Sequence, residues 1–223
     1  MTTINRHIIH LRICCIFFLL YIVCDLSTNA KDNIIFSHIS MEEGMSQATV
    51  FNVTQDSNGF MWIATNDGLN RFDGYSFKIY RNDRKQHYSI GSDIIKTVVY
   101  DSENRLWVGT DKCLSYYDAL YDRFQNFYIA GTPPVEHIVP LDKERLLIHS
   151  KGQLWVFHTK TKKFTRSKSI PHVTTIYKHH DKVLIGSVSG LYACDTKTLK
   201  TTPIETKELY GKNIWTIAGD GSG

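Results

Sequence analysis

The chain has 223 residues, of which 26 are basic and 22 are acidic, and its net charge is +4. The basic residues form no stripe, which argues against a protein that binds nucleic acid. Three of the five cysteines lie within the first 24 residues, which leaves Cys113 and Cys194 in the rest of the chain. Two isolated thiols argue against a disulfide scaffold. We expect both to be buried as small apolar side chains.

Residues 1–30 have the pattern of a secretory signal peptide. Arg6 and Arg12 form a basic beginning, an apolar run covers residues 13–23, and Thr28-Asn29-Ala30 offers a cleavage site. The apolar run is short for a membrane span. The pattern predicts export to the periplasm, and an uncleaved membrane anchor is the alternative. The following segment, Ile34–Ile39, is predicted as a single strand.

A pattern of about 40 residues then recurs four times. Trp62 is followed 45 residues later by Trp107, then after 40 residues by Leu147 and after 37 by Leu184. A fixed period of this length indicates a repeat protein. In the first unit, apolar and polar residues alternate over four short runs, which predicts four strands: Val50–Gln55, Phe60–Ala64, Leu69–Phe72 and Ser76–Tyr80.

Turn residues separate these runs. Asp56 and Gly59 suit a tight turn, since aspartate can bond its own backbone and glycine accepts positive φ. Asn104 stands in the glycine's place in the second unit, and asparagine tolerates that conformation next best. Small residues recur at Ala64, Gly109 and Gly186, where we expect a neighbouring strand to approach closely. The residues expected to build the repeat are Asp56, Gly59, Trp62, Gly68, Leu69, Asp101, Trp107, Gly109, Leu114, Gly186, Gly190 and Leu191.

Four antiparallel strands in 40 to 45 residues are typical of a β-propeller blade. The sequence predicts an all-β fold with a partial propeller over residues 31–223. Blades are expected near residues 46–80, 91–129, 135–168 and 173–204, and residues 211–223 are expected to start a fifth. We expect Trp62, Trp107, Leu147 and Leu184 to be buried between blades. The segment Asn213–Asp220 is predicted as a first strand without its partners, so the propeller is expected to be incomplete.

The stretch 38–80 contains Asp56, Gly59, Trp62, Gly68 and Leu69 in the order D-x-x-G-x-x-W-I-x-T-x-x-G-L-x-R-F-D. This motif resembles the two-component regulator propeller repeats, which build the periplasmic sensors of hybrid two-component systems in carbohydrate-degrading bacteria. The resemblance is close for two units and recognisable for the other two. Sialidase-like blades share the Asp, Gly and Trp positions and remain an alternative.

The resemblance implies a longer parent protein anchored in the inner membrane. Such a parent would be a sensor histidine kinase with a phosphorelay and a DNA-binding domain, and a homodimer. This chain carries no kinase motif and no second apolar segment of about 20 residues. The implied partners are therefore an oligosaccharide or other small periplasmic ligand and the rest of the kinase. The membrane is expected to be reached only through the remainder of the parent or an uncleaved signal.

No catalytic, metal or cofactor motif is evident. His172, His179 and His180 are the densest histidine cluster, but their spacing differs from that of a structural zinc site and no cysteine accompanies them. No phosphate-binding loop or nucleophile elbow occurs. The sequence predicts no enzyme activity in this chain, no metal and no cofactor.

Propellers bind ligands mostly where the loops leading into the innermost strands meet the axis. The residues of this chain at those places are Gln47, Asp93, Glu136 and His172. They differ from unit to unit while the blade skeleton repeats, which makes them weak candidates for ligand contacts. We expect a sensor of glycan fragments. The alternatives are a secreted propeller enzyme of the lyase or sialidase kind and an extracytoplasmic scaffold for protein partners.

Overall fold

The computed structural model describes residues 38–219 except 132, 168–169, 171 and 210. The predicted signal peptide, most of the strand predicted at Ile34–Ile39, and residues 220–223 lie outside the described residues. The described residues from Ile39 onward form one compact unit. Nowhere in its described part is there a helix long and apolar enough to cross a membrane.

Sixteen strands are described, and they form four sheets of four strands each. The first sheet contains β1 (Val50–Gln55), β2 (Met61–Thr65), β3 (Gly68–Phe72) and β4 (Phe77–Tyr80). The second contains β5 (Ile95–Tyr100), β6 (Leu106–Thr110), β7 (Leu114–Asp118) and β8 (Arg123–Phe127). The third contains β9 (His137–Pro140), β10 (Arg145–Ser150), β11 (Gln153–His158) and β12 (Lys163–Arg166). The fourth contains β13 (Val173–His179), β14 (Lys182–Ser187), β15 (Gly190–Asp195) and β16 (Thr201–Pro203).

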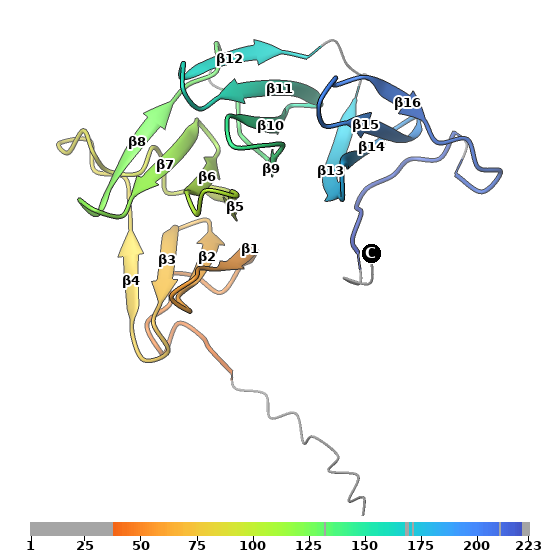
Figure 1. Cartoon of the computed structure of the whole chain (residues 1–223). Helices are drawn as coiled ribbons and strands as arrows, with labels where there is room; N and C mark the ends of the chain where they lie inside the picture. The colour runs from red at the N-terminus through yellow and green to blue at the C-terminus, as the bar shows by residue number, and fades with distance from the viewer. Residues whose placement is uncertain (1–37, 132, 168–169, 171, 210, 220–223) are drawn as a thin grey trace, which may run out of the picture. The chain divides into compact units, whose positions relative to one another are not determined.

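Each sheet is an antiparallel meander in chain order, which is the construction of a propeller blade. The first strands of the four sheets lie innermost, where β1 packs on β5, β5 on β9 and β9 on β13 (Figure 1). The prediction of an all-β propeller with four-stranded blades is confirmed. We number the blades 1 to 4 in chain order.

In blades 1, 2 and 3, an aspartate just after the innermost strand organises the following turn. In blade 1, Asp56 Oδ1 accepts hydrogen bonds from the backbone N–H groups of Asn58 and Phe60, and its Oδ2 accepts one from Trp62 Nε1 at 3.1 Å. The same turn in blade 2 contains Asn104 at φ +55°, where blade 1 has Gly59 at φ +88°. One carboxylate thereby fixes both the turn and the indole that follows it.

The large side chains of the second strands fill the junctions between blades. Trp62 packs among core residues of blade 2 and lies 4.9 Å from the ring centre of Tyr117. Trp107 packs against blade 3 and lies 5.6 Å from the ring centre of Phe157. Leu147 belongs to the core shared with blade 4. Each of these three side chains is only 1% exposed.

Two features of the last part of the chain differ from expectation. Leu184, the counterpart of the tryptophans, is only half-buried. Residues 213–219 of the predicted fifth first strand form no strand. An innermost strand takes its ladder of hydrogen bonds from the second strand of its own blade, and no such strand follows among the described residues. Ile214 is nevertheless held against blade 4, because its N–H donates to Ser187 O at 3.1 Å.

Candidate functional site

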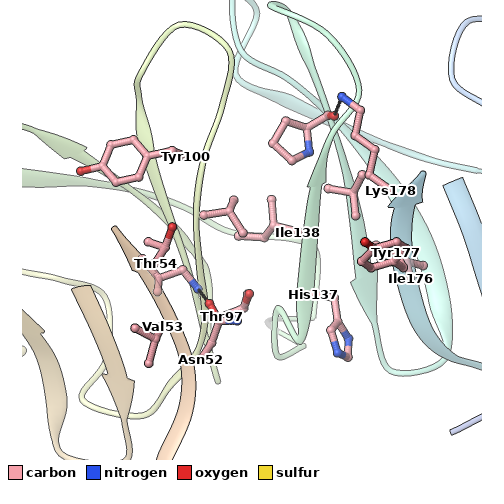
Figure 2. Close-up of a pocket in the computed structure, with 14 residues that line it drawn as sticks. Asn52, Val53, Thr54, Thr97, Tyr100, His137, Ile138, Ile176, Tyr177 and Lys178 are labelled. Carbon is pink, nitrogen blue, oxygen red and sulfur yellow. Dashed lines mark hydrogen bonds between the residues drawn. The ribbon is translucent and has the colours of Figure 1, made fainter. Parts of the chain in front are cut away.

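A pocket of about 420 Å³ lies along the innermost strands. Figure 2 shows it between residues of β1, β5, β9 and β13, with Asn52, Tyr100, His137 and Lys178 on different blades around it. Two of its polar groups are occupied in the fold, since Asn52 Oδ1 accepts a hydrogen bond from Val98 N and Lys178 Nζ donates to Pro140 O.

A second pocket, of about 440 Å³, lies where the chain leads into the innermost strands. We call it the mouth pocket, and it shares His137 with the first pocket. Its lining comes from four blades and the segment after them: Phe51, Lys96, Glu136, His137, His149, Gly152, Val173, Thr174 and Trp215. It combines acidic, basic, imidazole and aromatic groups.

The histidine pair in the mouth pocket arises from a break in the repeat. Blades 1, 2 and 4 place Ala64, Gly109 and Gly186 at one position of the second strand. At Gly109, an added Cβ would come 2.5 Å from Val135 O of the next blade. Blade 3 has His149 at this position, directly opposite His137. β1, β5 and β13 each contain a register shift, whereas β9 pairs with β10 in continuous register.

Hydrogen bonds define the protonation of this pair. His149 Nε2 lies 2.9 Å from Val173 O, and a carbonyl can only accept, so Nε2 carries a proton. The two Nδ1 atoms lie 3.1 Å apart and share one hydrogen bond. Burial lowers the pKa of His149 to about 4, against the opposing effect of its bond to Val173 O. Burial also lowers the pKa of His137, assisted by His149 and opposed by Glu136.

The charged groups of the mouth pocket are Glu136 and Lys96. Glu136 Oε2 accepts a hydrogen bond from Lys151 N at 3.2 Å and lies 3.4 Å from His149 Nε2. Lys96 Nζ lies 4.8 Å from the ring centre of Phe51, in a cation–π contact. With both histidines neutral, the formal charges of the pocket's side chains cancel.

Two aromatic side chains of the mouth pocket present faces to solvent. Phe51 is 44% exposed and Trp215 is 74% exposed. The segment carrying Trp215 is tied to blade 4, because Thr174 Oγ1 donates a hydrogen bond to Ile214 O. Aromatic faces beside hydrogen-bonding groups suit a ligand that has both apolar and polar surfaces.

Of the four residues proposed from sequence, only Glu136 lines the mouth pocket. Gln47 Oε1 accepts a hydrogen bond from Asn66 N, and Asp93 Oδ1 accepts one from Asn82 N at 2.6 Å. His172 is exposed and has φ +58°. The structure thus gives Gln47 and Asp93 a role in holding loops, and a ligand role for any of the four stays a prediction.

Sequence reasoning missed the other members of the pocket, notably Lys96, His137, His149 and Trp215. One signal was available, because His149 occupies the position that is Ala or Gly in the other three units. Lys96 and Trp215 carry no such mark, because neither stands at one of the positions that recur from unit to unit.

Metal binding finds no support in the described part of the chain, where no group of three or more His, Cys, Asp or Glu side chains could hold an ion. His179 and His180 contact each other at the turn after β13. Cys113 and Cys194 are both buried, and burial raises the pKa of each thiol.

We expect the histidine pair to make the stability of the fold depend on pH. His149 has a folded pKa of about 4, whereas an unfolded histidine titrates near 6.5. The unfolded chain therefore binds more protons between these values, and stability falls as the pH drops from 6.5 to 4, by up to about 3 kcal/mol. Urea unfolding across this pH range should show the loss of unfolding free energy. The His149→Gln variant should have a smaller slope of unfolding free energy against pH. An unchanged slope in the variant would contradict this origin.

Comparison with known proteins places these features in a family context. Residues 44–67 and 89–112 match the family described as two component regulator propeller. A stretch of 60 residues is 43% identical to histidine kinase P4 of Formosa agariphila, and it covers 27% of this chain and 4% of that protein.

Solved structures share the fold. The extracellular domain of a hybrid two component system of B. thetaiotaomicron aligns with a TM-score of 0.53 at 20% identity, over 74% of this chain and 31% of that one. Virginiamycin B lyase from Staphylococcus aureus aligns with a TM-score of 0.54 at 12% identity, over 74% of this chain and 58% of the lyase. The chain therefore spans less than a third of the aligned extracellular domain and a small fraction of the matched kinase.

Proposed function

We propose that this chain, a propeller with two-component regulator propeller repeats, is part of an extracytoplasmic sensor and binds an oligosaccharide at its mouth pocket. The signal would pass to a histidine kinase and DNA-binding domain elsewhere in a membrane-anchored parent, acting as a homodimer. The family match at residues 44–67 and 89–112 and the identity to a histidine kinase support the sensor assignment. Export to the periplasm rests on the signal-peptide pattern of residues 1–30.

One observation carries the ligand assignment. Exposed rings of Phe51 and Trp215 share a pocket with the hydrogen-bonding side chains of Glu136 and His137. A sugar ring has apolar C–H faces that can lie on aromatic rings and hydroxyl groups at its edge that need polar partners. The volume of about 440 Å³ lies within the range of small-molecule sites.

Calorimetric titration of the purified protein with a panel of tetrasaccharides tests this assignment. At least one sugar should bind, and Glu136→Gln should weaken that binding about tenfold, because a hydrogen bond to a charged acceptor is lost. The matched control is Glu144→Gln, which removes an acid that is 55% exposed and lies outside the mouth pocket. An equal loss of sugar affinity in both variants would contradict binding at the mouth pocket.

Aromatic contact can be tested in the same way. Trp215→Ala should weaken sugar binding, whereas Tyr75→Ala should leave it unchanged, because Tyr75 is 96% exposed and lies outside this pocket. Absence of binding by any sugar would favour a scaffold for protein partners. Turnover of a polysaccharide, lost in Glu136→Gln, would favour the enzyme alternative.

A further inference from the structure

We infer that His137 Nε2 is a fixed hydrogen-bond acceptor in the mouth pocket, so that the site takes neutral, hydroxyl-rich oligosaccharides in preference to sugars that carry carboxylates. This inference rests on the proposed function and specifies the ligand class. It makes His137 a residue that determines specificity.

The acceptor follows from a chain of three groups. Val173 O accepts a hydrogen bond from His149 Nε2 at 2.9 Å, which leaves a lone pair on Nδ1 of a neutral His149. His149 Nδ1 then accepts from His137 Nδ1 at 3.1 Å. The proton of a neutral His137 is therefore on Nδ1, and its Nε2 has a lone pair. This tautomer is imposed by a backbone carbonyl of the next blade.

Nothing in the described part of the chain uses that lone pair. The recorded hydrogen bond of His137 is the one from Nδ1, and the ring contributes to both pockets. His137 is the first residue of β9, and Figure 2 shows its ring projecting away from the neighbouring Ile138 side chain. A ligand group that meets Nε2 must donate a hydrogen bond, as a hydroxyl does and a carboxylate cannot.

Glu136 adds a second acceptor to the same wall. Its Oε2 is engaged by Lys151 N, and Oε1 has no recorded partner in the described residues. An ionised carboxylate is an acceptor only. Two acceptors on adjacent residues suit a pair of neighbouring sugar hydroxyls and oppose a ligand carboxylate by repulsion.

The single cation of the mouth pocket does not reverse this preference. Lys96 Nζ rests on the ring of Phe51, and its charge is matched by that of Glu136. The two histidines contribute no positive charge while they are neutral. A ligand carboxylate would therefore meet no surplus of positive charge among the side chains that line the pocket.

The test combines a direct reading of the tautomer with matched ligands. Nitrogen-15 NMR of the protein labelled at histidine should show His137 protonated at Nδ1 at pH 7. Titration calorimetry should then compare each neutral tetrasaccharide of the panel with its counterpart in which C6 is oxidised to a carboxylate. We expect the neutral member to bind at least about tenfold more tightly.

The His137→Gln variant gives the matched comparison, because its amide offers both a donor and an acceptor. We expect this variant to bring the dissociation constants of the neutral and acidic sugars closer together. The melting temperature of the variant at pH 7 shows whether it is folded. A His137 protonated at Nε2, or tighter binding of the acidic sugars, would overturn this inference and leave the proposed function standing. Failure of every sugar to bind would overturn both.

Discussion

Replacing Trp107 with alanine is expected to lower the free energy of unfolding by about 3–5 kcal/mol, the usual cost of removing a buried indole. Trp107 is 1% exposed and fills the junction between blades 2 and 3, where it touches Tyr116, Phe127 and Phe157. Its loss also leaves Asp101 Oδ2 without the indole donor that lies 2.7 Å away. Chemical unfolding followed by circular dichroism would measure the change.

Trp215→Ala is the matched control for that experiment. This side chain is 74% exposed and belongs to the segment after blade 4. Its removal should change the unfolding free energy by no more than about 0.5 kcal/mol, as expected for a surface substitution. Similar changes in unfolding free energy for the two substitutions would show that burial between blades is not what stabilises the propeller.

The second large effect is expected for Asp101→Ala. The carboxylate is fully buried and accepts hydrogen bonds from Glu103 N, Arg105 N, Arg105 Nε and Trp107 Nε1. Removing it leaves several donors, including a guanidinium, without an acceptor. We therefore expect the free energy of unfolding to fall by about 3–5 kcal/mol. The midpoint of urea unfolding should fall accordingly.

Asp142→Ala at the corresponding turn of blade 3 provides the control. Its side chain is 42% exposed, and blade 3 has Leu147 where blade 2 has Trp107, so no indole depends on it. Asp142 accepts from Glu144 N, Arg145 N and Arg145 Nε, groups that water can reach after substitution. The expected loss is about 1 kcal/mol. A loss as large as that of Asp101→Ala would mean that the turn, rather than the buried indole contact, dominates.

The two variants and their controls separate two contributions of the repeat to stability. The tryptophan stabilises a junction between blades, and the aspartate stabilises a turn within one blade while orienting that tryptophan. The contact between the aspartate and the indole is local in sequence, since Asp101 and Trp107 lie six residues apart. This locality explains why the repeat pattern was sufficient to identify the blades.

The mouth pocket could not be predicted in the same way. Glu136 was proposed from its place before an innermost strand, and it does line the pocket. Gln47 and Asp93 were proposed by the same argument, yet their side chains hold backbone groups of nearby loops. The position of a residue before an innermost strand predicts that it lies near the end of the propeller axis. It does not predict whether the side chain is already hydrogen-bonded to the backbone of a nearby loop.

Alternation, turn residues and period predict the all-β class, the four-stranded blade and the recurring Asp–Trp turn, because each of these signals acts over a few residues at a time. The set of groups that meet in the mouth pocket depends instead on contacts between blades. His137 and His149 face each other across a strand pair, and Val173 of the next blade fixes their protons. Phe51, Lys96 and Trp215 join them from segments far apart in the chain. Such convergence depends on the register and packing of whole blades, which no short pattern of residues encodes.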